Sequence, residues 1–170
     1  MSTGDGTGAG MHLAELNIGR LLAPTGDPRV AEFMASLDRI NGLGRRMPGF
    51  VWMMEGSGAP GTGNTENSIG DDPQFVANLS VWESVEALET FVWGTVHRQF
   101  YERRAEWFEL MGEMHFVMWW VAPGHRPTLQ EGLDRLDHLK ARGDSDHAFG
   151  WAHARAARMW RTHRCAVAAE

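Results

Sequence analysis

The spacing of hydrophobic positions along this 170-residue chain changes several times, which predicts alternating strands and helices. Short alternating or wholly apolar runs predict four strands, over residues 12–18, 50–54, 74–82 and 115–121. Apolar residues at helical spacing predict three helices, over residues 28–44, 84–111 and 128–141. Asp27 is expected to cap the first helix, with Pro28 in its first turn.

The element order is β-α-β-β-α-β followed by a C-terminal helix, which predicts a ferredoxin-like α+β fold with a four-stranded antiparallel sheet. Helices are expected on one face of this sheet. The other face is almost wholly apolar, with Leu16 and Ile18 on the first strand and Leu79 and Val81 on the third. We expect a second copy of the chain to cover it, which predicts a homodimer of the dimeric α/β-barrel kind.

The predicted domain spans residues 11–142. Residues 1–10 are expected to be a disordered leader, and residues 143–170 a C-terminal extension without a clear pattern. Residues 55–74 hold almost nothing apolar and are long for a loop between two strands, which is typical of a loop that is either functional, for example as a lid, or disordered.

Polar side chains gather on the opposite parity of the first and third strands. Polar groups in the middle of a sheet are costly unless they are hydrogen-bonded or face a wet cavity. We therefore expect a pocket between this face and the second long helix, although these residues could instead bond one another, and the two faces could be reversed. The positions are Glu15, Asn17, Asn78, Ser80 and Trp82.

The second long helix offers a matching stripe that contains Trp93, His97, Arg104 and Phe108, with Tyr101 as a further candidate contact. Histidine can transfer protons near neutral pH, and arginine can hold an anionic oxygen. The alternative is structural, with His97 bonded to a backbone carbonyl and Arg104 paired with a glutamate.

The start of the fourth strand adds two candidates. His115 and Trp119 share one face there, and His115 would form a proton-transfer couple with Glu15 if both side chains faced inward.

Composition narrows the classes of partner. Eight Trp, eight Phe and ten Met suit a pocket for a planar ligand or, equally, an aromatic core. A net charge of −6 argues against nucleic acid. The single Cys165, the lack of a signal peptide and the lack of a membrane-length apolar run favour the cytoplasm.

Several of these segments together resemble a bacterial family catalogued as a domain of unknown function, similar to the antibiotic-biosynthesis-monooxygenase-like, dimeric α/β-barrel superfamily. The resemblance rests on NLSVWESVEALETFVW (78–93), His97, Arg104, Trp107-Phe108 and WWVAPGHRPT (119–128). It implies three functional classes, which are cofactor-free monooxygenases, proteins that bind or degrade haem, and cyclases, isomerases or dehydratases of small metabolites.

We therefore predict a small-molecule enzyme of specialised metabolism acting on an apolar, aromatic or polyketide-like substrate, without cofactor or metal. It would carry out oxygenation, cyclisation or isomerisation. His97 and Glu15 would act as acid or base, Arg104 would hold an anionic oxygen, and Asn17 and the tryptophans would position the ring. The alternatives are a haem protein with His97 as axial ligand and a non-catalytic ligand-binding dimer. No nucleic acid or membrane partner is expected.

Overall fold

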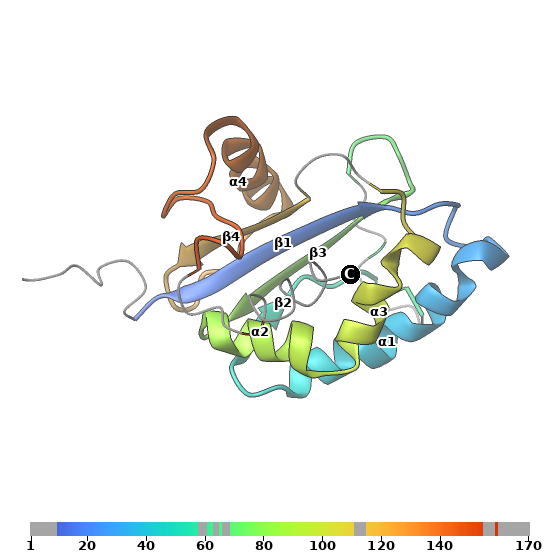
Figure 1. The fold of residues 1–170 in the computed structure, drawn as a ribbon, viewed down its shortest axis with the longest axis horizontal. Coiled ribbons are helices and arrows are strands. Elements are labelled where there is room, and N and C mark those ends of the chain that lie inside the picture. The colour runs from blue at the N-terminus through green and yellow to red at the C-terminus, as the bar shows by residue number, and fades with distance from the viewer. Residues whose placement is uncertain are drawn as a thin grey trace, which may run out of the picture.

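Four antiparallel strands form a single sheet in the order β2-β3-β1-β4 (Figure 1). The strands are β1 (His12–Arg20), β2 (Phe50–Met53), β3 (Phe75–Trp82) and β4 (Phe116–Val121). The computed structural model describes residues 10–57, 61–62, 65, 69–110, 115–154 and 159. These strands confirm all four predicted ones. Their alternating or wholly apolar residues suit the buried, pleated surface of a sheet.

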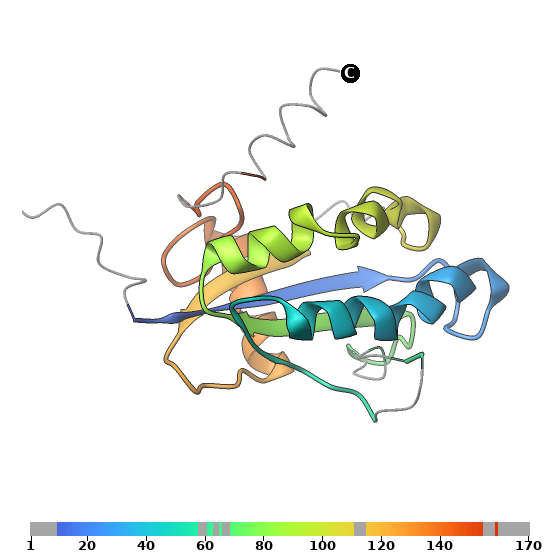
Figure 2. The same ribbon diagram turned by 90° about the horizontal axis from the view of Figure 1, so that it is seen from below.

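Two helices cover one face of the sheet, as predicted (Figure 2). They are α1 (Ala31–Arg46) and α2 (Val85–Gly94). A 3₁₀ turn, Pro28–Val30, leads into α1, and the Asp27 side chain caps it by accepting a hydrogen bond from the Arg29 amide. The Ser84 hydroxyl caps α2 in the same way by accepting from the Ala87 amide.

The single long helix predicted over residues 84–111 is wrong. α2 ends at Gly94, Thr95 is extended, and a short helix α3 (His97–Glu102) follows. The Thr95 hydroxyl donates to the Phe91 carbonyl at 2.6 Å and accepts from the His97 amide at 3.2 Å, so it ends one helix and begins the next. Glycine breaks helices readily, and the helical phase is lost here. Met111 lies outside the described residues.

A fourth helix, α4 (Leu129–Arg142), lies on the opposite face of the sheet (Figure 1). Its Leu136 and Leu139 are buried in one cluster with Leu16 and Trp119. Gly132 permits this close packing, since a Cβ there would lie 3.0 Å from a methyl carbon of Leu16. The expectation that this face needs a second copy is therefore wrong, because the chain covers it itself. The homodimer remains a prediction that this face no longer requires.

The segment after α4 packs against the outer edge of β4. Phe149 and Met118 exchange two backbone hydrogen bonds, of 2.7 and 2.9 Å, and Ala148 and Phe149 are buried. The start of the predicted C-terminal extension is thus part of the folded core, whereas residues 1–9 and most of 155–170 lie outside the described residues. Within the described part of the chain, no helix has the length and apolar character to span a bilayer.

Candidate functional site

The sheet face beneath α1 and α2 carries three rows of side chains from neighbouring strands. Residues paired across antiparallel strands share a face, so the pairing fixes the rows. They are Leu13 with Trp82 and Trp120, Glu15 with Ser80 and Met118, and Asn17 with Asn78 and Phe116. The predicted sharing of one face by Glu15, Asn17, Asn78, Ser80 and Trp82 is confirmed, and this face lies on the predicted side.

Solvent reaches this face at one row and is excluded at the next. Asn17 is exposed although it lies within a strand paired on both sides, whereas Glu15, two residues away, is only 5% exposed. The helical cover is thin here because α2 has ended and the residues of α3 are exposed or only partly buried. The site therefore has an open end at Asn17 and Asn78 and a closed end at Glu15.

A buried hydrogen-bond chain lies at the closed end. The Trp82 indole N–H donates to the Ser80 hydroxyl at 2.8 Å, and that hydroxyl donates to Glu15 Oε1 at 2.5 Å. Burial raises the pKa of Glu15 from 4.5 to about 8, and the Ser80 hydrogen bond opposes this rise. Glu15 is thus mostly a neutral carboxylic acid at pH 7, with a pKa suited to proton transfer near neutrality.

His97 at the start of α3 stands on an aromatic stack that leads back to this chain. Its ring lies 4.9 Å from the Phe91 ring, and Phe91 stacks on Trp82 at 5.3 Å between centroids. Burial lowers the pKa of His97 from 6.5 to about 4, with an opposing contribution from a hydrogen bond to the Val92 backbone. The imidazole is therefore neutral at pH 7.

The haem alternative requires that a ring nitrogen of His97 be able to reach the iron. The Nδ1 atom of this ring is enclosed and has no hydrogen-bond partner among the described residues. Ligation by Nδ1 would therefore require the surrounding side chains to move, and a haem iron would have to bind the other ring nitrogen, Nε2. Among the residues described, no group of three or more His, Cys, Asp or Glu side chains is placed to hold a metal ion.

Arg104 does not share a site with His97. It is exposed, donates to the Tyr101 carbonyl at 2.9 Å, and its guanidinium carbon lies 4.3 Å from the centre of the Tyr101 ring. The predicted stripe assumed one continuous helix, and the break at Gly94 turns Arg104 away. Tyr101 in turn contacts Trp93, which is buried.

The remaining predicted contacts lie at the periphery or on the other face. Phe108 packs over Gly19, where a Cβ would lie 2.7 Å from its ring. Trp119 belongs to the α4 face and donates its indole N–H to Glu131. His115 lies just before β4, and the Glu15 carboxyl group bonds Ser80 rather than His115.

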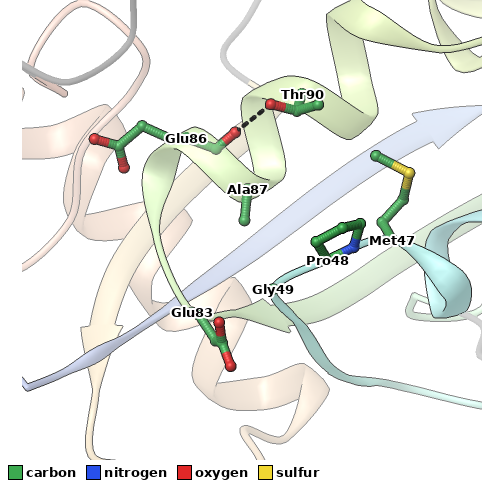
Figure 3. Close-up of a pocket in the computed structure, with 7 residues that line it drawn as sticks. All are labelled: Met47, Pro48, Gly49, Glu83, Glu86, Ala87 and Thr90. Carbon is green, nitrogen blue, oxygen red and sulfur yellow. Dashed lines mark hydrogen bonds between the residues drawn. The ribbon is translucent and has the colours of Figure 1, made fainter.

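A separate hollow of about 310 Å³ lies between the α1–β2 turn and the start of α2 (Figure 3). Ala87 points toward Gly49 there, and a Cβ on Gly49 would lie 2.5 Å from the Ala87 side chain. The two carboxylates at this hollow, Glu83 and Glu86, are exposed. Because it contains no buried polar side chain, we do not regard it as the functional site.

Sequence reasoning identified the polar row but missed how it is enclosed. Phe91, which links His97 to Trp82, was not among the predicted pocket residues. Gly94 is the one signal that could have indicated the helix break, and with it the correct phase of the residues that follow.

Comparisons with solved structures and with protein families place the chain as follows. No curated protein matches the chain. SnoaB, a cofactor-independent oxygenase from Streptomyces nogalater, is similar at a TM-score of 0.44 and 16% identity, over 71% of this chain and 99% of that chain. A likeness of this degree bears on neither reaction nor substrate. A family model, Domain of unknown function (DUF3291), matches residues 12–165, and the chain therefore belongs to this family.

Proposed function

We propose that the protein is a small-molecule enzyme that uses Glu15 for acid–base catalysis on an apolar, aromatic or polyketide-like substrate. The observation that supports this most is a buried carboxyl group next to a row of the sheet that solvent reaches. Burying an ionisable group without a charged partner is costly, and such groups concentrate where their chemistry is used. The Asn17 and Asn78 amides and the surrounding aromatic rings would orient the substrate.

Enolisation is the reaction that this arrangement suits. The ionised form of Glu15 would take a proton from a carbon next to a carbonyl group, and the C–H electron pair would move into the carbonyl to give an enolate. Glu15 then holds the proton as the neutral acid that its surroundings favour. Return of the proton to another carbon gives isomerisation, and attack of the carbanion within the substrate gives ring closure. Addition of molecular oxygen to the carbanion would be the first step of a cofactor-free oxygenation.

The structure changes the predicted roles of two residues in this proposal. Arg104 would not hold the enolate oxygen, since it is exposed and turned toward Tyr101. His97, neutral at pH 7, would form part of the wall rather than donate a proton. Asn17 and Asn78 would instead stabilise the enolate oxygen through their side-chain N–H groups.

Deuterium exchange into model compounds tests this proposal without knowledge of the natural substrate. The purified protein would be incubated in D₂O with a panel of aromatic ketones and β-diketones, and deuterium at the α-carbon would be followed by NMR. We expect catalysed exchange with at least one compound, at a rate that rises with pH toward about 8 as Glu15 ionises. Glu15→Gln should abolish this exchange, whereas Glu86→Gln, which changes an exposed carboxylate on α2, should not.

Two further measurements on the same purified protein would favour the alternatives. Ligand-induced changes in tryptophan fluorescence without exchange would indicate a non-catalytic binding protein. A Soret band in the purified protein that is lost in His97→Ala would indicate a haem protein and would contradict the proposal.

A further inference from the structure

We propose that Trp82 and Ser80 act as positioning residues that hold the acid proton of Glu15 on Oε2, the carboxyl oxygen left for a ligand. This inference rests on the proposed function, because it assigns that oxygen a role in the site. It follows from the direction of two hydrogen bonds within the sheet.

The direction of the chain is set by the indole. A tryptophan N–H can only donate, so the Ser80 oxygen accepts from Trp82 at 2.8 Å. Ser80 is 3% exposed, and its own hydrogen has no acceptor other than Glu15 Oε1 among the described residues. Reversing the second bond would leave a buried hydroxyl hydrogen unpaired, which is costly. The hydroxyl therefore donates to Oε1, and the acid proton must sit on Oε2.

Oε2 is the carboxyl oxygen that the chain of hydrogen bonds leaves unused. Only Oε1 accepts from Ser80, and Oε2 makes no hydrogen bond to any described residue. Its hydrogen-bonding capacity is thus left for a ligand at the closed end of the site. The next row of the same face, Asn17 and Asn78, is the one that solvent reaches.

The fixed proton defines which ligand atom fits. At neutral pH the closed end presents a hydrogen-bond donor, the acid proton on Oε2. It therefore suits a ligand with an acceptor such as a carbonyl oxygen at this point, and disfavours a ligand that presents only an N–H or O–H donor here. When Glu15 ionises, the same oxygen becomes the base. Oε2 would therefore be the oxygen of Glu15 that faces a ligand in both protonation states.

Among the described residues, no other charged group contributes to the pKa shift of Glu15. The elements that cover this face carry Glu89 on α2, which is buried, and His97 on α3, and neither contributes to the pKa shift of Glu15. The charged residues of α1 are exposed, and β4 has none. The Ser80 hydrogen bond is the contribution that a substitution can remove.

The test is the titration of Glu15 followed by NMR on protein labelled with ¹³C at the glutamate carboxyl carbon, with Glu15→Gln identifying its signal. If Ser80 donates, its bond favours the ionised form, and Ser80→Ala should raise the midpoint by about one pH unit. If Ser80 instead accepts the acid proton, its bond favours the neutral form, and the midpoint should fall. A fall, or no shift, would overturn the proposal.

Three further variants separate positioning from structure. Ser80→Thr keeps the hydroxyl and should restore the wild-type midpoint. Trp82→Phe removes the N–H that polarises the hydroxyl and should give a smaller rise in the same direction. Ser36→Ala removes a serine hydroxyl on α1 that bonds the Glu32 carbonyl and should leave the midpoint unchanged.

Failure of this inference and failure of the proposed function would look different. A raised midpoint in Ser80→Ala without any deuterium exchange would support the positioning and refute the enzyme. A lowered midpoint would refute the positioning whatever the exchange experiment showed.

Discussion

Replacing Glu15 with glutamine should make the protein more stable, and increasingly so as the pH rises. Glutamine has the same shape and still accepts from Ser80, but it cannot ionise. In wild type the carboxyl pKa is about 8 in the folded chain against an ordinary value of 4.5, so unfolding above pH 4.5 releases a proton. High pH therefore favours the unfolded wild-type chain.

The size of the effect follows from the two pKa values. Below pH 4.5 both states are protonated, and the variant and wild type should differ by a constant offset. Between pH 4.5 and 8 wild type loses about 1.4 kcal/mol per pH unit relative to Glu15→Gln. The difference should therefore reach about 3 kcal/mol at pH 7 and level off near 5 kcal/mol above pH 8.

Urea unfolding followed by tryptophan fluorescence, from pH 4 to 9, measures this difference directly. Glu86→Gln provides the control, because it removes an exposed carboxylate away from the buried row and should lack the rise expected for Glu15→Gln. If the Glu15→Gln difference were also flat, Glu15 would ionise normally in the folded protein. The buried neutral acid, and the chemistry proposed for it, would then be wrong.

Three further substitutions test other parts of the structure. Wild type should lose about 3 kcal/mol of stability as the pH falls from 6.5 to 4, because His97 takes up a proton in the unfolded chain but not in the folded one. His97→Asn should not show this loss, and urea unfolding midpoints at pH 7 and pH 4 would measure the difference. Gly19→Ala should lower the free energy of unfolding by about 1–3 kcal/mol, because the new methyl group would collide with Phe108. Adding Phe108→Leu should recover part of this loss. Equal melting temperatures for wild type, the single variant and the double variant would contradict the contact. Leu136→Ala should cost about 2–5 kcal/mol in urea unfolding, because α4 buries the second sheet face; a neutral result would mean that something else covers it.

The exposed position of Arg104 gives a prediction for the deuterium-exchange assay. Arg104→Ala should leave the exchange rate unchanged, since the guanidinium group contacts Tyr101 at the surface rather than the Glu15 site. A large fall in the rate would restore the role predicted from the sequence.

Local rules in the sequence predicted the elements and the faces of the strands. Alternate residues of a strand point to opposite sides, so parity placed Ser80 and Trp82 on one face of the third strand and Glu15 with Asn17 on one face of the first. The helix starts at Asp27, Ser84 and Thr128 were likewise readable, because a capping side chain bonds the backbone within its own turn.

The candidate site was only half predictable for the same reason. Its polar rows depend on strand parity, whereas its wall depends on where α2 ends. A helix that continued past Gly94 would have placed His97 and Arg104 on one line. The extended Thr95 shifts the phase, so the structure keeps His97 near Phe91 and leaves Arg104 outside.

The sequence by itself therefore determined the strands, the helix starts and the parity of the polar residues within each strand, since each depends on neighbours a few positions away. Only the tertiary structure decided that α4 covers the second face, that solvent reaches Asn17 but not Glu15, and that Glu15 stays protonated at neutral pH. These properties depend on burial and on contacts between distant positions, such as the bond between Ser80 and Glu15 across 65 residues of sequence.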